Sequence, residues 1–147
     1  MGILLVRHSD AVSETGAIDD AARWLTPRGR ARALASARAL AGRGLSFDRF
    51  VASPRVRAVQ TAELYAQVLG FAGPVECLPA LSFTEPAQDA VTALSGLAGN
   101  VAAFGHMPTL ADIVRALGHE NQARALATSE AVWIDAGRVV FRLPPSD

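Results

Sequence analysis

The stretch GILLVRHSDA, residues 2–11, contains the feature that decides the fold. Residues 3–6 are apolar without interruption. A short run of this kind is typical of a strand that is buried on both faces of a sheet. The run ends abruptly at Arg7 and His8. We therefore predict an interior strand whose carboxyl end presents an arginine and a histidine side by side.

Strands and helices alternate along the rest of the chain. Short apolar runs predict strands at 50–52, 74–78 and 100–106, and helical spacing of apolar residues predicts helices over 27–41, 56–69, 86–97 and 108–117. Two apolar runs around residues 135–137 predict a hairpin. This alternation predicts an α/β fold, a three-layer α/β/α arrangement with a mostly parallel central sheet and an antiparallel hairpin at its C-terminal edge.

Composition narrows the class of protein. The chain has 147 residues, of which 50% are hydrophobic, and its formal net charge is zero. Nucleic-acid and membrane-surface binding depend on excess positive charge, so we expect neither partner. No apolar run approaches the roughly 18 residues of a membrane span, no signal-peptide pattern is present, and we expect a cytoplasmic protein. The single cysteine, Cys77, excludes an internal disulfide.

Basic side chains gather at the predicted carboxyl ends of the strands, where open α/β sheets bind their ligands. The first strand ends in Arg7 and His8, the second is followed by Arg55 and Arg57, and the fourth ends in His106. Guanidinium groups bind a phosphoryl dianion through paired hydrogen bonds. A neutral imidazole is a competent nucleophile, and a second imidazole can stabilise the equatorial oxygens. This set predicts phosphoryl transfer that needs no metal or other cofactor.

Each of these segments also has a purely structural explanation. Arg-His is a common dipeptide, and Arg57 on an early helical turn could be solvated, the more so because all 14 basic residues of the chain are arginine. The sequence GHMP, residues 105–108, is compatible with an ordinary strand-to-helix turn. His119 follows a helix and is expected on the surface. The conjunction of several strand ends with phosphate-compatible groups is what favours a phosphate site.

Four motifs, in order, resemble the histidine phosphatase superfamily, and within it the short branch of SixA-type phosphohistidine phosphatases. They are LLVRHSDA (4–11), LTPRGRARA (25–33), VASPRVRAVQTA (51–62) and FGHMP (104–108), and the tail ATSEAVWID (127–135) also resembles that branch. The resemblance implies one phosphoglycerate mutase-like domain over residues 1–147. It implies that His8 is the nucleophile that becomes phosphohistidine, that Arg7 and Arg57 hold the phosphoryl group, and that His106 is the second pocket histidine.

Two features depart from the family pattern. Ser9 stands where the family usually has glycine after Arg-His, which raises the question of whether the backbone can approach a phosphate there. The general acid is also undetermined. Glu85 is the nearest carboxylate after the third strand, although an acidic residue is favourable at a helix N-terminus in any case. Asp10 is a comparable candidate, and it could equally orient His8 or a pocket arginine.

The lack of a clear acid bears on the substrate. An alkoxide leaving group needs a proton in the transition state, whereas imidazole, with a pKa of about 6.5, can depart already protonated. The short chain also leaves little room for insertions that would enclose a small substrate. We therefore expect hydrolysis of phosphohistidine on a protein, such as a histidine phosphotransfer domain in bacterial signalling. The alternatives are a phosphomonoesterase for small phosphorylated metabolites and a non-catalytic phosphate-binding module. A mutase is less favoured, because it would need a clear acid and more insertions.

Overall fold

The computed structural model describes residues 1–120 and 124–146. Six strands form one sheet in the order β3-β2-β4-β1-β5-β6. The strands are β1 (Gly2–Arg7), β2 (Arg49–Ala52), β3 (Val75–Cys77), β4 (Val101–Gly105), β5 (Ala131–Asp135) and β6 (Arg138–Leu143). The helices are α1 (Pro27–Ala41), α2 (Val56–Leu69), α3 (Ala87–Ser95) and α4 (Thr109–Gly118), with short 3₁₀ helices η1 (Asp20–Ala22) and η2 (Pro79–Leu81).

The direction of the strands confirms the predicted topology. β1 and β2 both pair parallel with β4, and β3 pairs parallel with β2. β5 runs antiparallel to β1 and to β6, so the last two strands form the predicted hairpin at one edge. Because β1, β2 and β4 are parallel neighbours, their carboxyl ends meet at one edge of the sheet. In this register Arg7 lies beside Gly105, and Ala52 lies beside Phe104.

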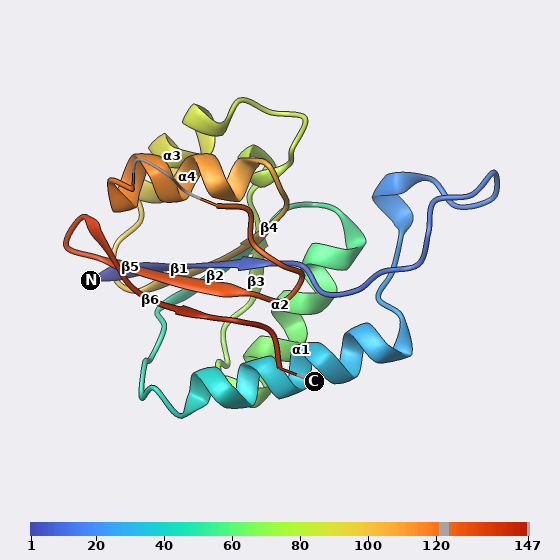
Figure 1. Cartoon of the computed structure of the whole chain (residues 1–147), viewed down its shortest axis with the longest axis horizontal. Helices are drawn as coiled ribbons and strands as arrows, with labels where there is room; N and C mark the ends of the chain where they lie inside the picture. Colours follow the sequence, from blue (N-terminus) through green and yellow to red (C-terminus); the bar gives the residue numbers. More distant parts are fainter. Residues whose placement is uncertain (121–123, 147) are drawn as a thin grey trace.

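The sheet is covered on both faces, which explains the unbroken apolar runs of its interior strands. Helices α1 and α2 cover one face, and α3 and α4 cover the other (Figure 1). Alternate residues of β1 enter the two cores: Leu4 and Val6 pack with the α1–α2 side, and Leu5 packs with the α3–α4 side. The three-layer α/β/α arrangement is therefore confirmed. No helix among the described residues is long and apolar enough to cross a membrane.

Local interactions mark several of the element boundaries. Thr26 caps α1, since its side-chain oxygen accepts a hydrogen bond from the Gly29 amide at 2.9 Å. In the β5–β6 hairpin, Ala136 and Gly137 both have positive φ, as a tight two-residue turn requires. Helix α3 is shorter than predicted, because Gly96 turns back onto carbonyls of its last turn. The two 3₁₀ helices were not predicted, since three residues are too few to show a period.

Candidate active site

A cavity of about 270 Å³ lies at the carboxyl end of the parallel strands. Its lining consists of Arg7, His8, Asp20, Arg23, Arg57, Phe83, His106 and Met107. The structure thus brings together four of the five basic residues at the predicted strand ends, the four to which the resemblance assigned the phosphate site: Arg7, His8, Arg57 and His106. It adds four that the sequence did not indicate: one carboxylate, one further arginine and two apolar side chains.

His8 is held in a defined orientation at the end of β1. Its amide donates to the Gly105 carbonyl at 3.0 Å, which ties it to β4. Its ring Nδ1 lies 2.8 Å from the Ser9 carbonyl oxygen. Because a carbonyl can only accept, Nδ1 carries the hydrogen and Nε2 keeps its lone pair. Burial lowers the pKa of His8 to about 4, with help from the charges of Arg57 and Arg7 and against the hydrogen bond to Ser9. The ring is therefore neutral at neutral pH.

His106 lies beside His8, with ring centroids 5.2 Å apart and planes inclined by 52°. Its Nε2 is 2.8 Å from the Ser53 hydroxyl, which follows β2. Its Nδ1 is buried and has no hydrogen-bond partner among the described residues. Burial, and then the neighbouring His8 and Arg57, lower the pKa of His106 to about 3. Three strand ends thus converge on this pair of imidazoles.

The two predicted phosphate-binding arginines are anchored by main-chain carbonyls. Arg7 Nη1 donates to the Leu126 carbonyl at 2.7 Å, and Arg57 Nη1 donates to the Asp20 carbonyl at the same distance. The Nε atoms of both arginines are buried without a hydrogen-bond partner among the described residues. Burial lowers the pKa of both groups, although an arginine stays charged in proteins. The arrangement provides fixed cations with donors left over, as an oxyanion site requires.

Sequence reasoning missed Asp20 and Arg23, which come from the segment between β1 and α1 (Figure 1). This segment lacks apolar periodicity, so the sequence predicted neither a strand nor a helix between His8 and Pro27. It is nevertheless ordered by local bonds: Asp19 caps η1, and Arg23 Nε donates to the Val12 carbonyl at 2.7 Å. The Asp20 carboxylate accepts from Arg23 Nη1 at 3.0 Å. The close spacing of Asp19, Asp20 and Arg23 before the LTP motif was the available signal.

Phe83 and Met107 supply the apolar part of the lining. The Phe83 ring is 40% exposed, and it packs edge-on against His106 with centroids 5.5 Å apart. The Arg55 guanidinium carbon lies 4.3 Å from the centre of the same ring. Arg55 therefore does not line the cavity itself but supports a residue that does.

The two predicted acid candidates lie outside this lining. The Asp10 carboxylate faces Arg32, whose Nη1 is 3.3 Å away, and accepts from the Thr128 hydroxyl at 2.9 Å. Glu85 is exposed in the turn before α3, where its amide bonds to the Ser82 carbonyl. Among the described residues that line the cavity, Asp20 is the only carboxylate.

Ser9 serves the fold rather than the cavity. Its amide donates to the Thr61 hydroxyl at 3.0 Å, and its own hydroxyl donates to the Gly29 carbonyl at 2.8 Å. Thr61 in turn donates to the Arg57 carbonyl at 2.8 Å. Ser9 thus joins the end of β1 to α1 and α2, and its amide is already occupied within the protein.

We expect Ser9→Gly to lower the free energy of unfolding by about 1–2 kcal/mol, because the Gly29 carbonyl loses a buried partner. Turnover should stay within about threefold, since Ser9 does not line the cavity and the variant keeps the main-chain carbonyl that contacts His8. Denaturant unfolding and p-nitrophenyl phosphate hydrolysis measure the two effects. Ser13→Gly, an exposed serine of the same segment, is the matched control for the added backbone freedom. A hundredfold loss of turnover at normal stability would contradict this role.

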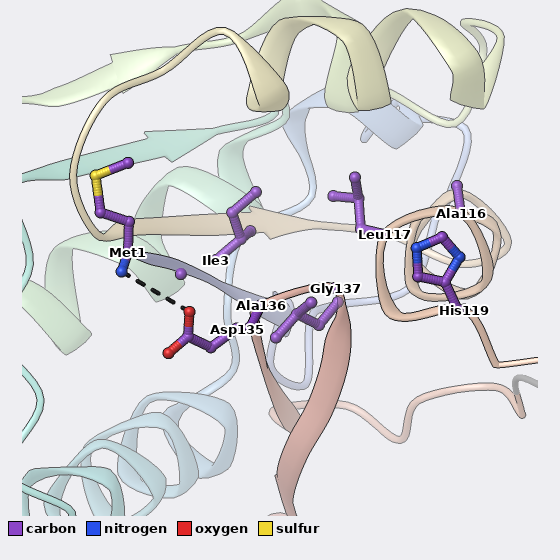
Figure 2. Close-up of a pocket in the computed structure, with 10 residues that line it drawn as sticks. Met1, Ile3, Ala116, Leu117, His119, Asp135, Ala136 and Gly137 are labelled. Carbon is purple, nitrogen blue, oxygen red and sulfur yellow. Dashed lines mark ion pairs between the residues drawn. The ribbon is translucent and has the colours of Figure 1, made fainter.

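A second cavity, of about 310 Å³, lies at the opposite end of β1 (Figure 2). Ile3 and Leu117 contribute to its walls, and the amino group of Met1 lies 3.8 Å from Asp135 at its edge. His119, predicted on the surface, is exposed and also borders this cavity. Within residues 1–120 and 124–146, no three His, Cys, Asp or Glu residues are grouped so that they could hold a metal ion.

Comparisons with known proteins bear on the family and the fold of the chain. The sequence pattern of the family described as histidine phosphatase superfamily (branch 1) matches residues 3–82. No curated protein matches the chain. The solved structure of the protein histidine phosphatase SixA complexed with tungstate is similar, with a TM-score of 0.88 and 24% identity over 98% of this chain and 97% of that one.

Two further solved structures show the same fold. A candidate phosphohistidine phosphatase SixA from Agrobacterium tumefaciens has a TM-score of 0.86 and 20% identity, covering 99% of this chain and 98% of its own. Phosphoglycerate mutase from Thermus thermophilus has a TM-score of 0.69 and 22% identity, covering 97% of this chain and 98% of its own. The predicted phosphoglycerate mutase-like architecture is confirmed. The family pattern spans more than half of the chain and includes Arg7, His8 and Arg57. The chain belongs to the histidine phosphatase superfamily.

Proposed function

We propose that this protein is a metal-independent phosphatase that hydrolyses phosphohistidine carried on a protein, with His8 as the transient phosphoryl acceptor. The observation that carries the proposal is the pairing of His8, whose Nε2 keeps its lone pair, with Arg7, Arg57 and His106 around one cavity. A neutral nucleophile surrounded by fixed cations and donors is suited to phosphoryl transfer.

In the first step, His8 Nε2 attacks phosphorus, and a new N–P bond forms as the bond to the leaving nitrogen breaks. Arg7 and Arg57 stabilise the equatorial oxygens, and the neutral ring of His106, whose Nε2 lies 2.8 Å from the Ser53 hydroxyl, offers a ring N–H to them. The leaving nitrogen keeps the electron pair of the broken bond. The imidazole departs as a neutral ring, because its other ring nitrogen carries a proton taken up from solvent. A water oxygen then attacks the phosphorus as the Nε2–P bond breaks. The electron pair of that bond returns to Nε2, Nδ1 keeps its hydrogen, and inorganic phosphate leaves with the protons of the water, so the neutral ring is restored.

The choice of phosphohistidine as substrate rests on the lack of a good proton donor among the described residues that line the cavity. Asp20 accepts hydrogen bonds from Arg23 and Arg57, which keep it ionised, so it is a poor proton donor. Asp10 and Glu85 lie outside the lining. A site without an acid suits a leaving group that can be protonated before it departs, and imidazole meets that condition whereas an alkoxide does not. The similarity to SixA supports the same substrate class, and we extend the proposal to a cytoplasmic role in bacterial signalling.

The test is phosphate release from a histidine-phosphorylated phosphotransfer protein, run beside p-nitrophenyl phosphate and phosphoserine. Release from phosphohistidine should be at least about a hundredfold more efficient than release from phosphoserine. Comparable or faster turnover of phosphoserine or of a phosphorylated metabolite would replace the proposal with a small-molecule phosphomonoesterase. Phosphate binding without turnover of any substrate would indicate a binding module.

The low pKa of His8 predicts an unusual pH profile. Because kcat/KM reports the free enzyme, it should stay level from pH 8 down to about 5 and fall only near pH 4, after correction for substrate ionisation. An ordinary histidine nucleophile would lose activity around pH 6.5, and a midpoint there would contradict the assignment.

Folding must be followed in the same titration. His8 and His106 have lower pKa values in the folded state than in the unfolded chain. As the pH falls below about 6.5, the unfolded chain takes up protons first, so stability decreases toward pH 4. Circular dichroism at each pH separates loss of fold from protonation of His8.

A further inference from the structure

Asp20 lines the cavity, and its carboxylate contacts three arginines. Its carboxylate accepts from Arg57 Nη2 at 3.2 Å and from Arg23 Nη1 at 3.0 Å, and it also pairs with Arg55 Nη1. Its main-chain carbonyl accepts from Arg57 Nη1 at 2.7 Å. Both terminal nitrogens of Arg57 are thus engaged by one residue, and that residue lines the cavity.

A carboxylate presents two oxygens to a guanidinium in the same way that a phosphate does. Burial alone would raise the pKa of Asp20, but the hydrogen bonds from Arg23 and Arg57 and the charges of Arg57 and Arg55 lower it overall. The group is therefore an anion at neutral pH. A phosphoryl dianion that enters the cavity lies near this negative charge, and both terminal nitrogens of Arg57 are already bonded to Asp20.

The effect differs between the ground state and the transition state. A bound phosphate dianion carries two negative charges on its oxygens. In a loose, metaphosphate-like transition state, the transferring group itself carries less negative charge. A fixed anion beside it therefore raises the free energy of the dianion more than that of the transition state.

We propose that Asp20 is a positioning residue that holds Arg57 in the empty site and weakens the binding of phosphate dianions, so that substrate is not bound too tightly and product phosphate leaves. This inference rests on the proposed phosphatase function. It assigns to Asp20 a role distinct from that of a general acid.

The test is Asp20→Asn, which keeps the shape of the side chain and removes its charge. Inorganic phosphate binding is measured by calorimetry without turnover, and kcat and KM are measured with p-nitrophenyl phosphate. We expect phosphate to bind on the order of tenfold more tightly, KM and kcat to fall together, and kcat/KM to change by less than about threefold. That split is the signature of lost ground-state destabilisation.

Two variants serve as controls. Asp19→Asn makes the same charge change one residue earlier, at an exposed N-cap outside the lining, and should leave phosphate affinity within about twofold. Asp20→Glu restores the charge and should return phosphate affinity toward that of the parent protein.

Unchanged or weaker phosphate binding in Asp20→Asn would overturn the inference, because it would leave Asp20 as a purely structural support for Arg57. If Asp20→Asn does not fold, Asp20→Ala takes its place. The inference is then overturned if Asp20→Ala binds phosphate no more tightly than the parent protein does. The proposed function is judged separately: absence of phosphohistidine turnover in the parent protein rejects that function, whereas the calorimetric comparison still decides the role of Asp20.

Discussion

His8→Ala should lower kcat for phosphohistidine and aryl phosphates by at least about a thousandfold. The substitution removes the only group that the proposed mechanism uses to form a bond to phosphorus. The backbone of β1 should be unaffected, because the bonds that fix its end involve the main chain: the His8 amide donates to Gly105, and the Ser129 amide donates to the Arg7 carbonyl. Loss of activity at normal stability is therefore the expected result.

The covalent intermediate gives a second readout. Protein-bound phosphate trapped from labelled substrate should be stable to base and labile to acid, as a phosphoramidate is, and it should be absent from His8→Ala. His119→Asn is the control, since His119 is exposed and borders the cavity at the other end of β1. Asparagine suits its left-handed backbone, with φ of 54°. Activity above about a tenth of the parent level in His8→Ala would reject His8 as the nucleophile.

The fold was predictable because its determinants are local. Residues 3–6 are apolar on both faces, Thr26 and Pro27 mark a helix start, and the Ala136-Gly137 pair marks a tight turn. These signals depend on periodicity, capping and backbone freedom, and a few adjacent residues determine each of them. Once the strands are assigned, the parallel order brings their carboxyl ends together without further information.

Four of the five basic residues that line the cavity were predictable for the same reason, since each lies at the end of a strand or soon after it: Arg7, His8, Arg57 and His106. The rest of the cavity was not. Asp20, Arg23 and Phe83 come from irregular segments, and their positions depend on long-range contacts such as the Arg55–Phe83 stack and the Arg57–Asp20 pair. No local pattern specifies those contacts. The acid candidates illustrate the limit: Asp10 and Glu85 are near the right residues in sequence, yet their side chains lie outside the cavity lining.

Gly29→Ala should strongly destabilise the fold. A Cβ atom at this position would overlap the main-chain oxygen of Asp10 and lie 2.9 Å from its carbonyl carbon, closer than real Cβ contacts. A backbone group cannot rotate away as a side chain can. We expect the free energy of unfolding to fall by about 3 kcal/mol, at the upper end of ordinary overpacking, although alanine is the better helix former. Thermal denaturation should show a Tm lower by roughly 6–12 °C.

Gly42→Ala is the matched control at the other end of α1. Gly42 has ordinary right-handed helical geometry, and a Cβ there would lie 3.4 Å from the Ala39 carbonyl oxygen, so the change should stay within about 1 kcal/mol. A Tm that is unchanged or raised in Gly29→Ala would mean that α1 does not approach the Asp10 backbone so closely.

Gly29→Ala also tests whether the contact between α1 and the segment after β1 helps to position His8. The Asp10 carbonyl accepts from the Thr26 amide at 3.0 Å, and the Gly29 carbonyl accepts from the Ser9 hydroxyl at 2.8 Å, so the start of α1 holds the two residues that follow His8. A side chain at position 29 pushes on that segment, whereas Ser9→Gly only removes one bond from it. Kinetic measurements on the folded fraction should therefore distinguish the two variants. We expect kcat to fall together with stability in Gly29→Ala and to be retained in Ser9→Gly. Parallel behaviour of the two variants would mean that the contact with α1 sets stability alone and does not position His8.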